Sequence, residues 1–334
     1  MIDEEVLDQL GPISDHKHYL KTSGYGPIQK LKFLLKYHFV FWSSFLKIKK
    51  AVRTGKIAIG PFKGEFGNFL GHVLPLLVYL HKRNVVIRFC SFEILQPYLV
   101  DESGDWIIRD FVALRDIYKE APPSTNFGEI PQDVEGQIRS FYDGIRGGTP
   151  IIDLGNHFYY WFIHKKLVAK YFSELYDLSL TYSEKSENAC AIFPRSKGAS
   201  HTKNNGAPWN YNDVVNLLQE KFDKVYVVGH PAYVEHIEGS EKVVPVVSSD
   251  NEQILKVISK SSHIFSQHSG VIYLAPLLRK RFVLLYNGGE KLSDIGSIQN
   301  TLYYLKALNG LNQIDYCFSL QDVDQLILTK TATD

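Results

Sequence analysis

The chain has 334 residues, of which 45% are hydrophobic and 22% charged, and its formal net charge at pH 7 is +1. This length favours two domains, and this composition is typical of a soluble globular protein with an ample core. The near-neutral charge gives no case for a nucleic-acid partner. The three cysteines lie far apart without CxxC or Cys-His spacing, so neither a disulfide framework nor a zinc site is indicated, and we expect a reducing, cytoplasmic location.

A basic aromatic segment dominates residues 1–55, which we expect to form an N-terminal helical region. Lysines and Arg53 flank an aromatic and aliphatic centre that is too short to span a bilayer and is interrupted by Lys36 and His38. This pattern is also what a helix in a membrane interface needs, so peripheral contact of residues 29–53 with an anionic membrane on its cytoplasmic face is one interpretation. The alternative, which the sequence favours, is a helix packed on the first domain with a solvated lysine fringe.

A βαβ unit opens the first predicted domain, residues 56–182. An apolar strand at 56–62 is followed by a glycine-rich turn, an apolar helix at 73–80 and a second strand at 84–89. The turn lacks the G-x-G-x-x-G spacing of dinucleotide folds, so no NAD or FAD cofactor is expected. The weaker pattern that follows predicts strands at 106–108 and 149–153 and a long aromatic helix at 156–176.

The second predicted domain, residues 189–334, follows a charged connector at 183–188. Short apolar runs alternate there with amphipathic segments, which predicts a second doubly wound parallel sheet. We therefore expect an α/β protein with two Rossmann-like domains that face a central cleft. The expected strands are 189–194, 224–229, 242–247, 263–266 and 282–286, and the expected helices are 209–222, 251–259, one from about 269, 297–308 and 319–328.

A candidate catalytic carboxylate lies in the turn after the first strand. Glu65, between Gly64 and Gly67, would point into the cleft and act as a general base. Alternatively, it is a capping or surface glutamate at a helix N-terminus, where negative charge is favourable. His72 is a rival base, although its place within the predicted helix suits packing better. The residues expected on this acceptor side are Lys63, Gly64, Asn68 and His72.

Polar residues at the strand ends of the second domain form a candidate anion site. In the turn at residues 266–270, Ser269 is suited to cap the next helix, and Gly270 allows the backbone to approach a ligand. A helix N-terminus favours a phosphate, although this turn could also be a cap that binds only water. The residues expected around a bound diphosphate are Arg195, Lys197, Gly229, His230, Pro231, Gln267, His268, Ser269 and Gly270.

These motifs together resemble the two-domain glycosyltransferases of the GT-B fold. The turn at 60–68 is similar to the one that carries the acceptor-side base in inverting members. Residues 192–195, 227–231 and 266–275 are similar to the donor half of heptosyltransferase-like and fucosyltransferase-like enzymes. The resemblance implies transfer of a sugar from a nucleotide-sugar donor to a hydroxyl of a glycan or glycolipid. It further implies that Glu65 is the base and that Arg195 and the amides at Ser269 and Gly270 stabilise the leaving diphosphate.

No metal is expected in this scheme. Asp322 and Asp324 match the D-x-D pattern of a different glycosyltransferase fold, but a position on an amphipathic C-terminal segment favours a solvated helix face. The donor half lacks the acidic motif of retaining enzymes, which favours inversion. The alternatives are a polysaccharide pyruvyltransferase on a similar frame, a sugar-nucleotide epimerase and a bilobed sugar-binding protein without catalysis.

Overall fold

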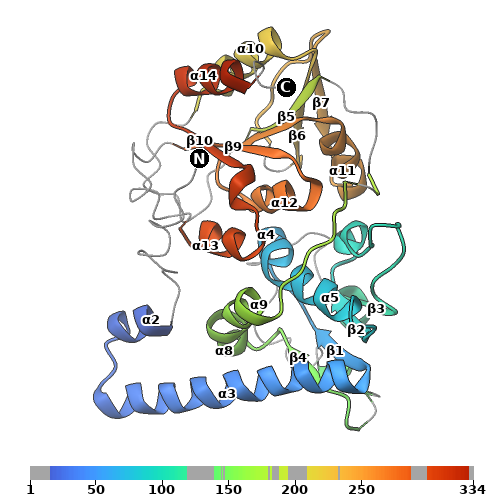
Figure 1. The fold of residues 1–334 in the computed structure, drawn as a ribbon, viewed down its shortest axis with the longest axis vertical. Coiled ribbons are helices and arrows are strands. Elements are labelled where there is room, and N and C mark those ends of the chain that lie inside the picture. Colours follow the sequence, from blue (N-terminus) through green and yellow to red (C-terminus); the bar gives the residue numbers. More distant parts are fainter. Residues whose placement is uncertain are drawn as a thin grey trace. The chain divides into compact units, whose positions relative to one another are not determined.

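Two all-parallel sheets, each carried by its own stretch of chain, form the structure, a computed structural model (Figure 1). The residues that it describes are 16–118, 139–143, 145, 147–179, 181–182, 188–194, 209–231, 234–286 and 299–330. They divide into an amino-terminal and a carboxyl-terminal unit between Tyr176 and Asp177. Asp177 belongs with the second unit because its carboxylate pairs with Arg279 at 2.7 Å. Most of the predicted connector at 183–188 lies outside the described residues.

The amino-terminal unit has a four-stranded sheet in the order β3-β2-β1-β4. Its strands are β1 (Lys56–Gly60), β2 (Val86–Ser91), β3 (Asp110–Ala113) and β4 (Ile151–Asp153). Its helices are α2 (His16–Thr22), α3 (Pro27–Thr54), α4 (Phe66–Asn68), α5 (Leu74–His81), α6 (Leu114–Ile117), α8 (His157–Tyr159) and α9 (Lys165–Tyr171). The π-helical turns Phe69–Val73 and Tyr160–His164 join α4 to α5 and α8 to α9. The predicted βαβ unit is confirmed, because β1 pairs with β2 in parallel.

The predicted strand at 106–108 is wrong. Trp106 forms only an isolated antiparallel bridge with Val100, and the strand of this region is β3. Asp101 explains the difference, because its side chain accepts hydrogen bonds from the amides of Ser103 and Asp105 and closes a turn. That turn takes the chain away from the ladder before β3 begins.

Helix α3 packs on the amino-terminal unit through one face only. Phe33, Tyr37, Ile48 and Ala51 are buried, as the packed-helix alternative requires. The opposite face is not merely a lysine fringe, however, since large apolar side chains are exposed along it. No helix among the described residues is long and apolar enough to cross a membrane.

The carboxyl-terminal unit has a six-stranded sheet in the order β10-β9-β8-β5-β6-β7, which is the strand order of a Rossmann fold. Its strands are β5 (Ala189–Phe193), β6 (Lys224–Gly229), β7 (Val243–Val247), β8 (His263–Ser266), β9 (Arg281–Leu285) and β10 (Ile314–Cys317). Its helices are α10 (Tyr211–Lys221), α11 (Asn251–Lys260), α12 (Leu274–Leu278), α13 (Gln299–Ala307) and α14 (Leu320–Lys330). The predicted strands of this unit are present as β5 to β9, and the helices predicted at 209–222, 251–259, 297–308 and 319–328 are present as α10, α11, α13 and α14, whereas β10 was not predicted.

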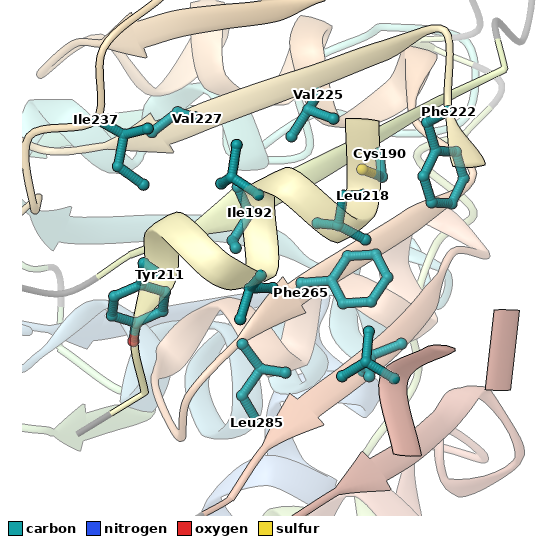
Figure 2. Packing of buried hydrophobic residues seen from close by; sticks show 14 of the residues in the cluster. Cys190, Ile192, Tyr211, Leu218, Phe222, Val225, Val227, Ile237, Phe265 and Leu285 are labelled. Carbon is teal, nitrogen blue, oxygen red and sulfur yellow. The ribbon is translucent and has the colours of Figure 1, made fainter. Parts of the chain in front are cut away.

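The core of this unit lies between α10 and the sheet (Figure 2). Leu218 of α10 is buried in the same cluster as Cys190 and Ile192 of β5 and Phe265 of β8. Burial of such side chains contributes about 1.5–3 kcal/mol each to stability. The central strands β5 and β8 are therefore held firmly, which fixes the loops at their carboxyl ends.

Candidate functional site

The chain order places a candidate site at the carboxyl ends of β1 and β4. These strands are neighbours in the sheet, although β2 follows β1 in the chain, so this is a topological switch point, where α/β sheets bind ligands. Gly60 ends β1 at a φ of 125°, and a Cβ there would lie 2.8 Å from the carbonyl oxygen of Cys90. Glycine is therefore required at this position. The Tyr142 hydroxyl donates a hydrogen bond to the Gly60 carbonyl at 2.7 Å and supports the exit of the strand.

Glu65 follows in this exit turn, directly before α4, and its side chain is exposed. Its backbone is extended, and its carbonyl accepts a hydrogen bond from the amide of Phe69 at 3.0 Å. Glu65 is the N-cap residue of α4, and its exposed side chain makes no capping hydrogen bond, which fits the alternative of a surface glutamate at a helix N-terminus. A general base is favoured by partial burial, which removes water from the carboxylate, and the exposed Glu65 side chain lacks that burial. Of its predicted neighbours, Lys63 and Asn68 are half-buried and Gly64 is buried.

Lys165, at the start of α9, is the charged partner of Glu65. The lysine is 7% exposed, and its Nζ lies 4.0 Å from the centroid of the Trp161 ring, one helical turn earlier. Burial lowers the pKa of Lys165 to about 8, and the Glu65 carboxylate acts against this by favouring the charged form. A cation that titrates near neutrality therefore lies in the electrostatic field of the candidate base. Sequence reasoning missed this residue, because a lone lysine on an aromatic helix resembles a surface residue.

Two buried histidines lie behind this turn. His164 is fully buried, and its Nε2 donates a hydrogen bond to the His72 carbonyl at 2.8 Å. Its Nδ1 accepts one from the Tyr159 hydroxyl at 3.2 Å. Burial lowers the pKa of His164 to about 3 and the pKa of His72 well below its usual range. His72 is 3% exposed and lies within the π-helical turn, so the structure places it in the packing behind the 61–65 turn.

The second candidate site lies at the switch point of the carboxyl-terminal sheet. Strands β5 and β8 are neighbours, with Phe193 opposite Ser266, so the loops after them start side by side. The loop after β5 carries Arg195 and Lys197, and both lie outside the described residues.

The 266–270 turn is held by its own hydroxyl groups. Ser266 Oγ donates to the Gln267 carbonyl at 2.9 Å and lies 3.3 Å from Ser269 Oγ. Ser269 precedes the next helical segment but makes no side-chain capping bond. That segment is a 3₁₀ turn, Gly270–Tyr273, followed by the short α12, rather than the predicted single helix. Pro276 explains the interruption, because it lacks the N–H that would bond to the Ile272 carbonyl in a continuous α-helix.

His268 of this turn is positioned by α13, a contact that sequence reasoning missed. Its Nε2 lies 3.0 Å from the Thr301 hydroxyl oxygen, at hydrogen-bond distance. The same hydroxyl interacts with Tyr273, a buried residue whose pKa is raised by burial. Thr301 thus joins the turn to the helix that follows β9. Nothing in the local sequence around residue 301 indicates this role.

The third predicted ligand loop follows β6, which is the other neighbour of β5. A Cβ at Gly229 would lie 2.8 Å from the Cβ of Val234, so close packing requires glycine here. The His230 carbonyl accepts a hydrogen bond from the Val234 amide at 3.0 Å. His230 is half-buried and Pro231 is exposed. The sheet order thus brings the starts of the three predicted donor-side loops to adjacent strand ends.

The D-x-D pattern has structural roles. Asp322 accepts hydrogen bonds from the amides of Phe318 and Ser319, both at 2.9 Å, at the start of α14. Asp324 pairs with Lys221 at 3.1 Å. The described part of the chain holds no group of three His, Cys, Asp or Glu residues that could bind a metal ion.

Heptosyltransferase structures are among the solved structures that are similar to this chain. E. coli ADP-heptose lps heptosyltransferase II gives a TM-score of 0.51 at 12% identity, over 83% of this chain and 99% of its own. E. coli heptosyltransferase WaaC with ADP gives 0.52 at 13% identity, and WaaC with ADP-2-deoxy-2-fluoro heptose gives 0.51 at 12%, each over 82% of this chain and 99% of the enzyme. No family model and no curated protein matches the chain. The likeness shows the fold, and this chain has the two-unit α/β architecture of GT-B glycosyltransferases.

Proposed function

We propose that the protein is a glycosyltransferase that moves a sugar from a nucleotide-diphosphate sugar to a hydroxyl of a glycan or glycolipid. The observation that carries this proposal is the position of the two candidate sites. In a chain of GT-B fold, Glu65 and the 266–270 turn each lie at the switch point of their own parallel sheet. The E. coli heptosyltransferase was solved with ADP and with an ADP sugar, which is the donor chemistry proposed here.

In this proposal the reaction is a single displacement with inversion. The acceptor oxygen attacks the anomeric carbon of the donor sugar while the Glu65 carboxylate takes the hydroxyl proton. The bond from the anomeric carbon to the diphosphate oxygen breaks, and the nucleoside diphosphate leaves with the electron pair. Fixed hydrogen-bond donors can stabilise that leaving group without a metal, and we assign this role to Arg195, Lys197 and the 266–270 turn.

Lys165 interacts electrostatically with the proposed base. The Glu65 carboxylate favours the charged form of this buried lysine, whose pKa burial lowers to about 8.

We place the acceptor at an anionic membrane surface in the cytoplasm. Helix α3 supports this placement, because it carries seven Lys and Arg residues and no Asp or Glu. Vesicle flotation at low salt tests the contact, and a protein that stays in solution with anionic vesicles would contradict it.

A donor screen tests the function itself. The intact protein is incubated with a panel of nucleotide sugars and with phosphoenolpyruvate, and thermal stabilisation and slow hydrolysis are measured. We expect at least one nucleotide sugar to stabilise the protein and to be hydrolysed slowly in the absence of acceptor. No response to any nucleotide sugar would contradict the proposal, and a response to phosphoenolpyruvate alone would favour the pyruvyltransferase alternative.

A further inference from the structure

A cavity of about 630 Å³ opens on the amino-terminal unit between α2, α3 and α9, and no residue of the 61–65 turn lines it. These three helices lie together on the same unit (Figure 1). Its aliphatic and aromatic lining consists of Leu20, Leu34, Tyr37, Phe41, Trp42 and Tyr171. A cavity of this size is large enough for a lipid headgroup with the first part of its acyl chains.

Apart from the two tyrosine hydroxyl groups, the polar side chains that line this cavity are all lysine or histidine. Helix α2 contributes His16, Lys17 and Lys21, and α3 contributes His38. Helix α9 contributes Lys166 and Lys170 from the other side. No Asp or Glu is among the lining residues, so the cavity attracts an anion from several directions.

The exposed face of α3 extends from this cavity as an apolar stripe. Trp42 belongs to both, since it lines the cavity and is 55% exposed. The stripe repeats at three- and four-residue spacing, which places its members on one side of the helix. It consists of Ile28, Leu31, Leu35, Phe39, Trp42 and Leu46, all more than half exposed.

The charge of α3 decides what covers this stripe. A second copy of the chain could bury the same residues by helix pairing, but it would bring seven cations against seven with no carboxylate on either helix. An anionic lipid surface has the complementary charge and also accepts the apolar side chains to a depth of about 5–10 Å.

We propose that the cavity between α2, α3 and α9 binds the phosphate headgroup of an anionic phospholipid whose acyl chains lie along the exposed stripe of α3. The phosphate is held between the lysines of α2 and α9, and Trp42 lies where the headgroup meets the acyl chains. The proposal deepens the membrane contact proposed above, and it is independent of which donor sugar the protein uses.

Soluble short-chain lipids test this site without a membrane. Dihexanoyl phosphatidic acid, dihexanoyl phosphatidylcholine and inorganic phosphate are titrated separately against the intact protein below the micelle concentration, with tryptophan fluorescence as the readout. We expect saturable binding of phosphatidic acid at least about tenfold tighter than binding of either other probe, because both the phosphate monoester and the acyl chains are held. Equal binding of inorganic phosphate or of phosphatidylcholine would overturn the lipid assignment.

Paired charge reversals locate the binding. Lys21→Glu/Lys170→Glu removes one cation from each side of the cavity and is expected to weaken phosphatidic acid binding at least about tenfold. Lys47→Glu/Lys50→Glu makes the same charge change on exposed lysines of α3 outside the cavity. This control is expected to change the affinity for phosphatidic acid less than about twofold. Equal effects of the two pairs would overturn the site. If the first pair unfolds, Lys21→Met/Lys170→Met replaces it with the same expectation.

Two further measurements separate this proposal from its rivals. Sedimentation of the free protein reports whether the stripe is buried between copies, and a stable dimer that does not bind lipid would overturn the proposal. Nucleotide-sugar binding is measured on the same samples. Lipid binding without any nucleotide response would leave this site standing and remove the glycosyltransferase proposal.

Discussion

The two candidate turns occupy equivalent places in their sheets but have different surroundings. The 61–65 turn lies in the field of Lys165 and in front of the buried His72 and His164. The 266–270 turn is held by the hydroxyl groups of Ser266 and Thr301. One turn therefore has a buried cation beside it, and the other is built on neutral hydrogen bonds. The first suits proton transfer, and the second suits a fixed anion.

Loss of the proposed base should give the largest effect. Glu65→Gln keeps the shape of the side chain but removes its capacity to take a proton, so we expect turnover to fall by about 10²–10⁴ while donor affinity is kept. Steady-state kinetics and donor titration measure the two separately. Glu93→Gln, at another exposed glutamate of the same unit, is the matched control. Unchanged turnover in the Glu65 variant would remove it as the base.

Acid should destabilise the amino-terminal unit through His164. The folded-state pKa of about 3 lies below the unfolded value of 6.5, so the unfolded chain binds more protons between these values and stability is lost as the pH falls. The loss approaches about 3 kcal/mol at a pH of about 4. Urea unfolding of the wild type and of His164→Gln at several pH values measures it. We expect the free energy of unfolding to depend less steeply on pH in the variant than in the wild type. Parallel plots of this free energy against pH would contradict the lowered pKa of His164.

Lys165 should also destabilise the folded protein, and it should do so at neutral pH, because burial lowers its pKa as well. Its pKa falls from 10.5 to about 8 on folding, so the cost of burying its charge is fully present below 8 and disappears as the pH rises toward 10.5. Lys165→Met should therefore be more stable than the wild type by up to about 3 kcal/mol at pH 7. The difference between the two proteins should vanish at high pH, and this comparison cancels the titration of groups that both share. A difference that is constant with pH would contradict the lowered pKa.

Loss of the Thr301 hydroxyl beside the 266–270 turn should give the smallest effect, a change in donor affinity. Thr301→Val removes the hydroxyl near His268, and the loss of one hydrogen bond of about 1 kcal/mol should weaken donor binding about fivefold. Thr301→Ser keeps a hydroxyl at this position and should restore affinity. Donor titration with both variants measures this, and weakening by both would show that the methyl group matters instead.

The strands of the carboxyl-terminal unit were predictable because each is a short apolar run between polar turns. The core strand β5 is buried and consists only of apolar residues, which is typical of a parallel sheet, and β8 is buried around Ile264 and Phe265. Strand β10 was missed because it is an edge strand with Asp315 in its middle. That carboxylate lies 3.8 Å from Arg281 of β9, a pairing that only the folded sheet reveals.

The candidate sites were predictable only where the signal is local. Glycines and polar residues after a strand mark a turn, so Glu65 and the 266–270 turn could be identified from the sequence. Lys165 and Thr301 act on those turns from about a hundred and from about thirty residues away, and no local pattern marks them. The exposed stripe of α3 was visible as an aromatic segment, but its orientation depends on which face the sheet buries.

A crystal structure with the nucleotide sugar that stabilises the protein most would test directly whether the 266–270 turn binds the donor diphosphate. We predict that the diphosphate oxygens lie within hydrogen-bond distance of the 266–270 turn and that the acceptor side of the sugar faces the Glu65 carboxylate. A donor bound with its diphosphate away from the 266–270 turn would contradict the account.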